Sequence, residues 1–393
     1  MSATERLRTA VIGLGGMGAG HLATIRDQVP EMELTALCGR DPGRVAEHAK
    51  RAGVPGFTSL PDLIASHCCQ AVVIATPHPQ HAAMATACLE AGLEVIVEKP
   101  LTESIATARR LVALAESRGR TLAVIFNQRT TPAHAALIRL VRDGAIGVVR
   151  RFTLISPDIR TQAYYDSGAW RATWRGEGGG VAINQGSHLL DVLVQAIGLP
   201  ESVQAWTAAK GHAIEVEDVV EARLVLPGGA SGFYHASTVE PRIDPLFEIV
   251  GDRGRLALRD TLRHWRFDPP TSQFIRDEPG MWTRPAPVEV PVELPAGTGS
   301  HGEVFRNVAS HILHGEPLRF SSSSALGQVE LTCALLMSGH LGRAVTLPLD
   351  GEAYAGFLTE RRDANQGAKA NLREQRVTDP GSAPSPAKAT AKT

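Results

Sequence analysis

The sequence predicts an α/β protein in which a doubly wound parallel sheet is followed by an α+β domain with a large, mostly antiparallel open sheet. In the first third of the chain, short and continuously apolar runs alternate with helical patterns, as a parallel sheet covered on both faces requires. Beyond about residue 126 strands crowd together, and many alternate apolar and polar residues, which suits an antiparallel sheet with one covered face. We therefore expect two domains and a tail, over 1–125, 126–350 and 351–393.

Repeated strand–helix units of this length indicate a doubly wound domain. Its expected strands are 7–12, 32–38, 70–75, 93–98 and 121–126, with helices near 16–29, 41–52, 60–67, 79–91 and 102–118. In the second part we expect helices near 132–143, 180–197, 301–314 and 322–341, and strands at 148–156, 201–209, 216–226, 231–240, 245–251, 254–259, 262–267 and 344–349. From about residue 360 the composition is rich in Ala, Lys, Pro and Ser, which predicts disorder.

Composition narrows the class of partner. The net charge is −1 and the pI is near 6.9, so no bulk field attracts nucleic acid or an anionic membrane. No apolar run approaches the roughly 18 residues that span a bilayer, and the short polar N-terminus leads directly into the first strand, so we expect a cytoplasmic protein. The five cysteines show no metal or disulfide spacing, which predicts reduced structural thiols and no metal site.

A glycine loop follows the first strand and opens the first helix. In it Gly13 permits a tight turn, Gly15 lets the backbone approach a pyrophosphate, and Gly18 permits close packing of helix on strand. The phosphate is then held by the free N–H groups at the positive end of the helix. This context predicts a Rossmann domain that binds NAD or NADP over residues 1–125.

The end of the second strand indicates which cofactor is used. An acidic residue there hydrogen-bonds the ribose 2′-hydroxyl of NAD, whereas a nearby arginine pairs with the 2′-phosphate of NADP. This chain has Gly39 at the expected position of the acid and Arg40 after it, while Asp41 is needed as the N-cap of the next helix. The sequence therefore favours NADP, although an exposed arginine is also a common solvated side chain.

Two further segments carry residues with catalytic chemistry. Lys99 lies at the carboxyl end of a buried strand, where ligands bind in open α/β sheets. In a helix over 180–197, Asn184, His188 and Asp191 would share one face. Taken singly, Lys99 could be a surface charge and His188 a core histidine. However, only six of the 40 basic residues are lysine, so a lysine in an apolar setting is informative.

The order of these segments resembles the Gfo/Idh/MocA family of oxidoreductases, the relatives of glucose-fructose oxidoreductase and inositol dehydrogenase. The resemblance extends to about residue 350, and its most specific part is the Glu-Lys-Pro element with the later glycine-rich segment. The motifs that carry it are AVIGLGGMGAGH, Ala75-Thr76-Pro77 with His81, Glu98-Lys99-Pro100, the Tyr164-to-Trp174 loop, GGGVAINQGSH with Asp191, and GRAVTLPL.

This resemblance implies that the domain over 126–350 binds substrate between itself and the cofactor, and forms a homodimer or homotetramer through its open sheet. It also implies that Lys99 holds or protonates the reacting oxygen and that His188 is the acid/base, roles which suit their chemistry. The cofactor-contacting positions that it implies are Gly13, Gly15, Gly16, Met17, Gly18, Gly39, Arg40, Thr76, Pro77, His81, Glu98, Lys99 and Asn127.

The substrate positions include one departure from the family pattern. Many relatives have aspartate where this chain has Asn184, and an amide cannot accept a proton at neutral pH. This shifts proton transfer to Lys99 and His188 and leaves Asp191 to bind a hydroxyl or orient the imidazole. Aromatic rings with charged groups suit a polyhydroxylated ring, and the substrate residues expected are Lys99, Tyr165, Arg171, Trp174, Asn184, His188 and Asp191. His78 is a second departure from the family pattern, in which asparagine often follows the Thr-Pro turn.

These residues predict an NAD(P)-dependent oxidoreductase that transfers a hydride between the nicotinamide and a secondary hydroxyl or ketone of a sugar, sugar derivative or cyclitol. The small-molecule partner is thus a carbohydrate or polyol. Two other classes stay open: a glycosidase that uses transient oxidation by bound NAD, and a non-catalytic sugar sensor that binds the cofactor. Reduction of an imine or a non-sugar carbonyl is a further alternative.

Overall fold

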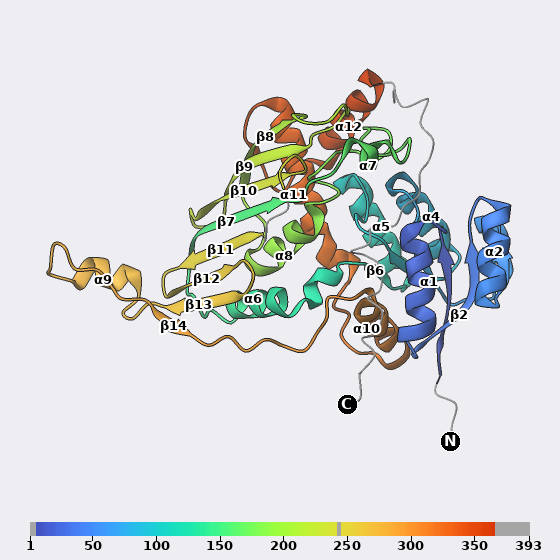
Figure 1. Cartoon of the computed structure of the whole chain (residues 1–393), viewed down its shortest axis with the longest axis horizontal. Coiled ribbons are helices and arrows are strands. Elements are labelled where there is room, and N and C mark those ends of the chain that lie inside the picture. The colour runs from blue at the N-terminus through green and yellow to red at the C-terminus, as the bar shows by residue number, and fades with distance from the viewer. Residues whose placement is uncertain (1–4, 242–244, 366–393) are drawn as a thin grey trace, which may run out of the picture.

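The computed structural model describes residues 5–241 and 245–365 and contains two sheets, as the sequence predicts (Figure 1). The first is a six-stranded parallel sheet in the order β3-β2-β1-β4-β5-β6. Because the strand order reverses between β1 and β4, the loops that follow these two strands separate and leave a crevice for a ligand. The strands are β1 (Leu7–Ile12), β2 (Met32–Cys38), β3 (Gly56–Phe57), β4 (Ala71–Ile74), β5 (Glu94–Val97) and β6 (Leu122–Val124).

Helices cover both faces of this sheet, which explains why its strands are continuously apolar: β4 is buried at every residue. The helices are α1 (Gly16–Gln28), α2 (Pro42–Ala52), α3 (Leu60–Ala65), α4 (His81–Glu90) and α5 (Ile105–Arg118). Helix α2 begins as predicted, because the Asp41 side chain accepts a hydrogen bond from the N–H of Arg44 and Pro42 occupies the first turn.

The second sheet has nine strands in the order β14-β13-β12-β11-β7-β10-β9-β8-β15. All neighbouring pairs are antiparallel except β7 and β10, so the predicted open sheet is confirmed. Helices α6 (Pro132–Arg142), α8 (Ser187–Ile197) and α11 (Ser322–Leu341) lie together beside it (Figure 1). The strands are β7 (Val149–Pro157), β8 (Ser202–Ala208), β9 (Val219–Val225), β10 (Ser231–Ser237), β11 (Leu246–Gly251), β12 (Gly254–Leu258), β13 (Leu262–Arg266), β14 (Val288–Val290) and β15 (Val345–Thr346).

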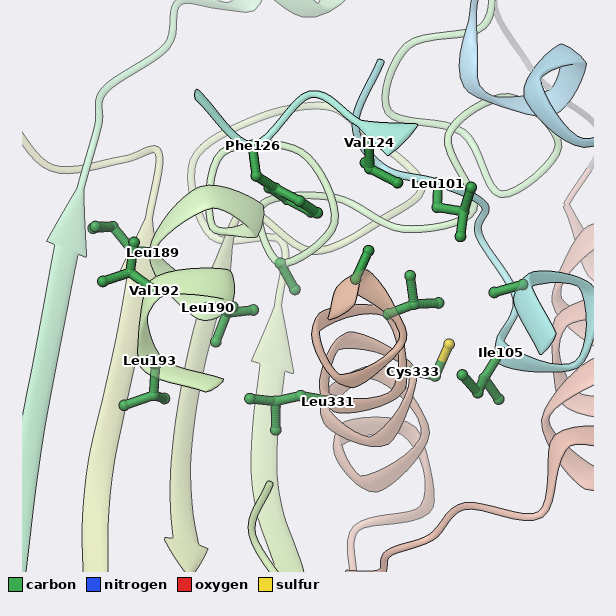
Figure 2. Close-up of a cluster of buried hydrophobic side chains, with 14 of the residues drawn as sticks. Leu101, Ile105, Val124, Phe126, Leu189, Leu190, Val192, Leu193, Leu331 and Cys333 are labelled. Atoms are coloured by element: carbon green, nitrogen blue, oxygen red, sulfur yellow. The ribbon is translucent and has the colours of Figure 1, made fainter. Parts of the chain in front are cut away.

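One apolar core joins the two sheets. Figure 2 shows part of this core, with Phe126, which follows β6, and Leu190 of α8. From α11, Leu331 projects toward α8 and Cys333 toward Ile105. The N–H of Val124 also donates to the carbonyl of Phe320, just before α11. Because α8 and the end of β6 share this core, the loops that enter the crevice from the two sheets are held in a fixed relation.

A second core lies on the other face of the first sheet and includes a helix from late in the chain. Helix α10 (His301–His314) packs Val304, Phe305 and Val308 against a cluster that contains Val11 of β1 and Ile96 of β5. The chain therefore enters the second sheet after β6 and returns to the first sheet through α10, beside α1 (Figure 1).

The predicted helix over 180–197 begins only at Ser187, and 181–186 form turns. The cause is Glu217, whose carboxylate accepts from the N–H groups of Gly180 and Ala182 and whose carbonyl accepts from Val181. These contacts hold the segment in a tight turn that precedes the helix. Asn184 and His188 are therefore positioned by a turn and by a helix start, not by one continuous helix.

The described chain is still helical where the sequence predicts disorder to begin, near 360. Helix α12 (Gly351–Ala364) continues through this position, capped by the Asp350 carboxylate on the N–H groups of Glu352 and Ala353. The rest of the predicted disordered tail, 366–393, lies outside the described residues. Two short helices in loop regions were not expected from the sequence, α7 (Gln162–Asp166) and α9 (Thr271–Asp277).

Candidate active site

The glycine loop has the geometry of a phosphate cradle. Gly13 has φ +97°, and a Cβ there would lie 2.5 Å from the carbonyl oxygen of Ala75; a Cβ on Gly18 would lie 1.7 Å from that of Gly13. A Cβ on Gly15, by contrast, would meet no described atom within 4 Å. No described side chain caps the amino end of α1, which begins at Gly16, so its N–H groups are available to an anion. These residues fit a dinucleotide.

The other predicted cofactor positions follow neighbouring strands at the same edge of the first sheet: Arg40 after β2, Thr76 and Pro77 after β4, Glu98 after β5 and Asn127 after β6. Arg40 is exposed, and a Cβ on Gly39 would lie 2.9 Å from Cδ1 of Leu14. Met17 is also exposed. The Asn127 amide donates to the carbonyl of Gly299 at 2.5 Å, and its Oδ1 is buried without a partner among the described residues.

Glu98 and His81 are buried and make contacts within the protein. One Glu98 oxygen lies 2.7 Å from Nε2 of His21 and the other accepts from the N–H of Lys99. Although burial opposes ionisation, the hydrogen bond and charge of His21 hold the pKa of Glu98 well below its usual range. The ring nitrogens of His81 lie 2.8 Å and 2.9 Å from the carbonyl oxygens of Pro100 and Thr76. These two side chains brace the loop that carries Lys99.

Lys99 and Asn184 meet between the two sheets. Nζ of Lys99 donates to the backbone carbonyl of Asn184 at 3.1 Å and lies 3.4 Å from its Oδ1. Burial lowers the pKa of Lys99, while the charges of Glu98 and Glu177 raise it. The lysine thus has a carbonyl-lined environment and a proton that is easier to lose than that of an exposed lysine. The Lys99–Pro100 peptide is cis.

His188 lies in the first turn of α8, edge-on to the Phe126 ring with the ring centroids 6.0 Å apart. Burial, together with the nearby charge of Lys99, lowers the pKa of His188 to about 3. Its Nδ1 is buried and has no partner among the described residues. The imidazole is therefore neutral at pH 7 and offers a ligand hydroxyl a ring nitrogen that no described group occupies. The same burial makes it a weaker base than an exposed histidine.

Two residues of this cluster were not predicted from the sequence. Glu177 accepts from the Asn184 amide at 2.6 Å and from the N–H of Ala172 at 2.5 Å. The hydroxyl of Tyr164 lies within hydrogen-bond distance of Nη1 of Arg171 and of the Asn184 amide. The only sequence signal for Glu177 is an acidic residue directly before three glycines, and Tyr164 is the neighbour of the tyrosine that we predicted.

The predicted substrate residue Arg171 does join this cluster, since its guanidinium lies over the rings of Tyr164 and Trp170 at 4.5 and 4.6 Å. Trp170 in turn packs against His78, which is buried and has a pKa well below its usual value, chiefly because of desolvation. The aromatic loop therefore covers the loop that follows β4.

Three other predicted substrate residues point elsewhere. The hydroxyl of Tyr165 is buried against Oγ1 of Thr238 at 2.7 Å, and the Trp174 indole donates to the carbonyl of Glu215. Both oxygens of Asp191 are bound by the Arg129 guanidinium at 2.5 and 2.7 Å. The expectation that Asp191 binds a hydroxyl or orients the imidazole is therefore corrected, because this carboxylate forms a buried ion pair.

Within 5–241 and 245–365, no group of three or more His, Cys, Asp or Glu side chains could hold a metal ion. The same part of the chain includes no helix that is both long and apolar enough to cross a membrane.

Comparison with known proteins identifies the class to which this site belongs. Residues 7–126 match the family model described as "Oxidoreductase family, NAD-binding Rossmann fold", and residues 134–257 match the GFO/IDH/MocA C-terminal domain. The chain belongs to the Gfo/Idh/MocA family of oxidoreductases, as its motifs predict.

Several relatives carry names. Inositol 2-dehydrogenase of Rubrobacter xylanophilus is 38% identical over 37% of this chain and 42% of that protein, so the match spans less than half of its length. Trans-1,2-dihydrobenzene-1,2-diol dehydrogenase of Oryctolagus cuniculus is 30% identical over 61% of this chain and 71% of that protein. Among solved structures, the WlbA dehydrogenase of Chromobacterium violaceum, in complex with NADH and UDP-GlcNAcA, has a TM-score of 0.76 and 28% identity over 89% of this chain and 98% of that one.

Proposed function

We propose that this chain is an NAD(P)-dependent dehydrogenase that acts on a secondary hydroxyl of a sugar, a sugar derivative or a cyclitol. The observation that carries the proposal is the meeting of Lys99, Asn184 and His188 between the two sheets, beside the loops that fit a dinucleotide. The names of the relatives support the substrate class, since one is an inositol 2-dehydrogenase and another was solved with NADH and a sugar nucleotide.

The side chains supply what oxidation of an alcohol requires. When bound, the nicotinamide cofactor provides the acceptor for a hydride. The neutral His188 imidazole can take the hydroxyl proton, and the Lys99 ammonium can stabilise negative charge that develops on the oxygen. Asn184 fixes the ammonium through its backbone and side-chain oxygens. In the direction of reduction the same groups return the proton to the oxygen.

Replacing either group tests these roles. We expect Lys99→Ala and His188→Ala each to lower kcat by about 10²–10⁴-fold, the usual contribution of a positioned acid or base. The affinity for NAD(P)H, measured by fluorescence titration, should stay within about threefold of wild type, because the phosphate cradle is built from the glycine loop and the start of α1. Turnover retained in either variant would refute the assigned role.

We further propose that NADP is the preferred cofactor. The support is the exposed Arg40 at the end of β2, together with the engagement of Asp41 as the cap of α2. A comparison of kcat/KM for the two cofactors, in wild type and in Arg40→Ala, tests this proposal. NADP should be favoured by wild type and lose that advantage in the variant. A strong preference of wild type for NAD would contradict it.

A screen of sugars and inositols with both cofactors separates this proposal from its alternatives. Formation of NAD(P)H with a sugar or cyclitol supports the dehydrogenase. Release of an aglycone without net formation of NAD(P)H would identify a glycosidase that uses transient oxidation. Cofactor binding with no turnover over the whole panel would identify a sensor, and turnover only with imines or non-sugar carbonyls would identify another reductase.

A further inference from the structure

Glu177 is a buried carboxylate that the steps above do not use. Its side chain is 1% exposed and comes from the segment that links the aromatic loop to the turn before α8. Its carboxylate accepts hydrogen bonds from the N–H of Ala172 at 2.5 Å and from the Asn184 amide at 2.6 Å, and it pairs with the Arg171 guanidinium at 3.8 Å. Although burial raises the pKa of Glu177, these donors favour its ionised form.

This surrounding fixes the orientation of Asn184. A carboxylate only accepts hydrogen bonds, so the NH₂ group of Asn184 must face Glu177 and its Oδ1 must face Nζ of Lys99. A neutral amide cannot balance the charge of the ammonium, but the carboxylate lies directly behind the amide. The chain Glu177–Asn184–Lys99 thus joins a buried anion to a buried cation through one amide.

We propose that Glu177 is a positioning residue for the reaction. It orients Asn184 and, from behind this amide, supplies the negative charge that holds the Lys99 ammonium in place. The inference rests on the proposed role of Lys99 and goes beyond it by assigning a function to a residue outside the expected site.

The proposal can be tested by exchanging the carboxylate and the amide between positions 177 and 184. In Glu177→Gln only one oxygen remains, and when it keeps accepting from the N–H of Ala172 the new NH₂ group faces the Asn184 NH₂. The Asn184 amide then turns and presents NH₂ to Lys99. In Asn184→Asp, two carboxylates face each other at the present distance of 2.6 Å. In the double variant Glu177→Gln/Asn184→Asp, the glutamine donates to the aspartate and still accepts from Ala172, and the aspartate still faces Lys99. The donor–acceptor pattern is restored with the charge moved.

The three variants therefore have distinct expected activities. We expect each single substitution to lower kcat by about 10²-fold, in the lower part of the range for acid–base groups, with a smaller change in KM. The double variant should recover to within about tenfold of wild type. A double-variant loss equal to the product of the single losses would overturn the proposal, because independent sites are additive.

A second readout follows the ionisation of Lys99 without any turnover. The charged or titratable groups that act on Lys99 or feel its charge are Glu98, Glu177, Arg160, Arg171, His78, His188 and His301. Removing the Glu177 charge should lower the pKa of Lys99 below its wild-type value, and restoring a carboxylate at position 184 should return it to that value or above. Competitive labelling with an amine-reactive reagent as a function of pH, read at Lys99 by mass spectrometry, measures this pKa in a chain with only six lysines.

Glu330 offers a matched control. It is also a buried carboxylate, accepts from the N–H of Leu349 at 2.6 Å and pairs with Arg109 at 3.1 Å, away from Lys99. We expect Glu330→Gln to lower the melting temperature without moving the Lys99 labelling curve. A labelling curve that is unchanged in Glu177→Gln would overturn the proposal. If wild type shows no dehydrogenase activity while the labelling shifts occur, the proposed function fails and the Glu177–Asn184–Lys99 linkage stands.

Discussion

The side chains around Lys99 show how the same residue type can have different roles one position apart. Tyr164 and Tyr165 are adjacent, yet the first hydroxyl faces Asn184 and Arg171 whereas the second is buried against Thr238. The order of residues indicates that an aromatic loop precedes the site. It does not indicate which face of the short helix α7 is turned inward, because that depends on long-range packing.

The Asp191–Arg129 pair permits a test of stability. Because both side chains are buried, Asp191→Asn leaves the guanidinium without a compensating charge, and we expect a loss of about 3–5 kcal/mol in the free energy of unfolding. Urea denaturation measures it. Asp27→Asn, which removes an exposed partner of Arg26, is the control and should change stability by less than about 1 kcal/mol. Unchanged stability with lost turnover in Asp191→Asn would return Asp191 to the substrate site.

At the scale of elements, long strands were predicted better than turns, whereas the short strands β3 and β14 were not predicted. The bounds of β1 and β2 agree with the sequence ranges 7–12 and 32–38, because most of their residues are apolar and flanked by polar turns. The start of α8 was predicted seven residues too early. Its true start at Ser187 depends on Glu217, which binds the backbone of Gly180 from 37 residues away, and no local pattern reveals such a contact.

The glycine loop and the helix that follows it permit a matched pair of substitutions. Gly15→Ala places a methyl group where no described atom of the chain lies within 4 Å, on the side from which a pyrophosphate approaches. We expect an unchanged melting temperature and a loss of NAD(P)H affinity of about tenfold or more. Gly20→Ala, within helix α1 and with equal space, should leave affinity unchanged. Equal affinities in the two variants would contradict the cradle.

The turn held by Glu217 should depend on pH. Burial raises the pKa of Glu217 to about 7, above the ordinary value of 4.5 that the unfolded chain has. Below pH 4.5 the carboxyl is protonated in both states. Between pH 4.5 and 7 the unfolded chain loses its proton first, so the fold loses stability as pH rises, by roughly 3 kcal/mol for the full shift.

Glu217→Gln removes this titration. The unfolding free energies of wild type and variant are measured by urea denaturation from pH 4.5 to 8. Relative to the variant, the unfolding free energy of wild type should fall as pH rises and level off above pH 7. Taking the difference cancels the histidines common to both proteins. A difference that is constant with pH would show that Glu217 is ionised at no cost.

For the whole molecule, the motifs and the hydrophobic patterns of the sequence predicted the family and the two-sheet architecture. The oligomeric state is still a proposal. Trp206 on β8 and Phe233 on β10 are 55% and 43% exposed on the large open sheet. Large exposed aromatic residues on such a sheet favour contact with a second copy. We expect a homodimer or homotetramer by sedimentation, and a smaller species for Trp206→Glu/Phe233→Glu.

The control for the assembly is Trp282→Glu, which replaces an 85% exposed residue outside the sheet and should leave the sedimentation coefficient unchanged. A monomeric wild type, or a double variant that assembles like wild type, would contradict an interface on this sheet.

Because α10 packs on the first sheet, the first domain is not expected to fold when it is expressed as a separate fragment. A fragment that stops after residue 126 contains every strand of the first sheet but lacks Val304, Phe305 and Val308, which complete the core beside Val11. Such a fragment would expose an apolar face to water and is expected to aggregate when expressed alone. Co-expression with the remaining polypeptide should rescue it, because the complementary piece carries the missing helix. The two domains are thus expected to fold only together, because α10 follows the second sheet in the sequence but packs on the first sheet.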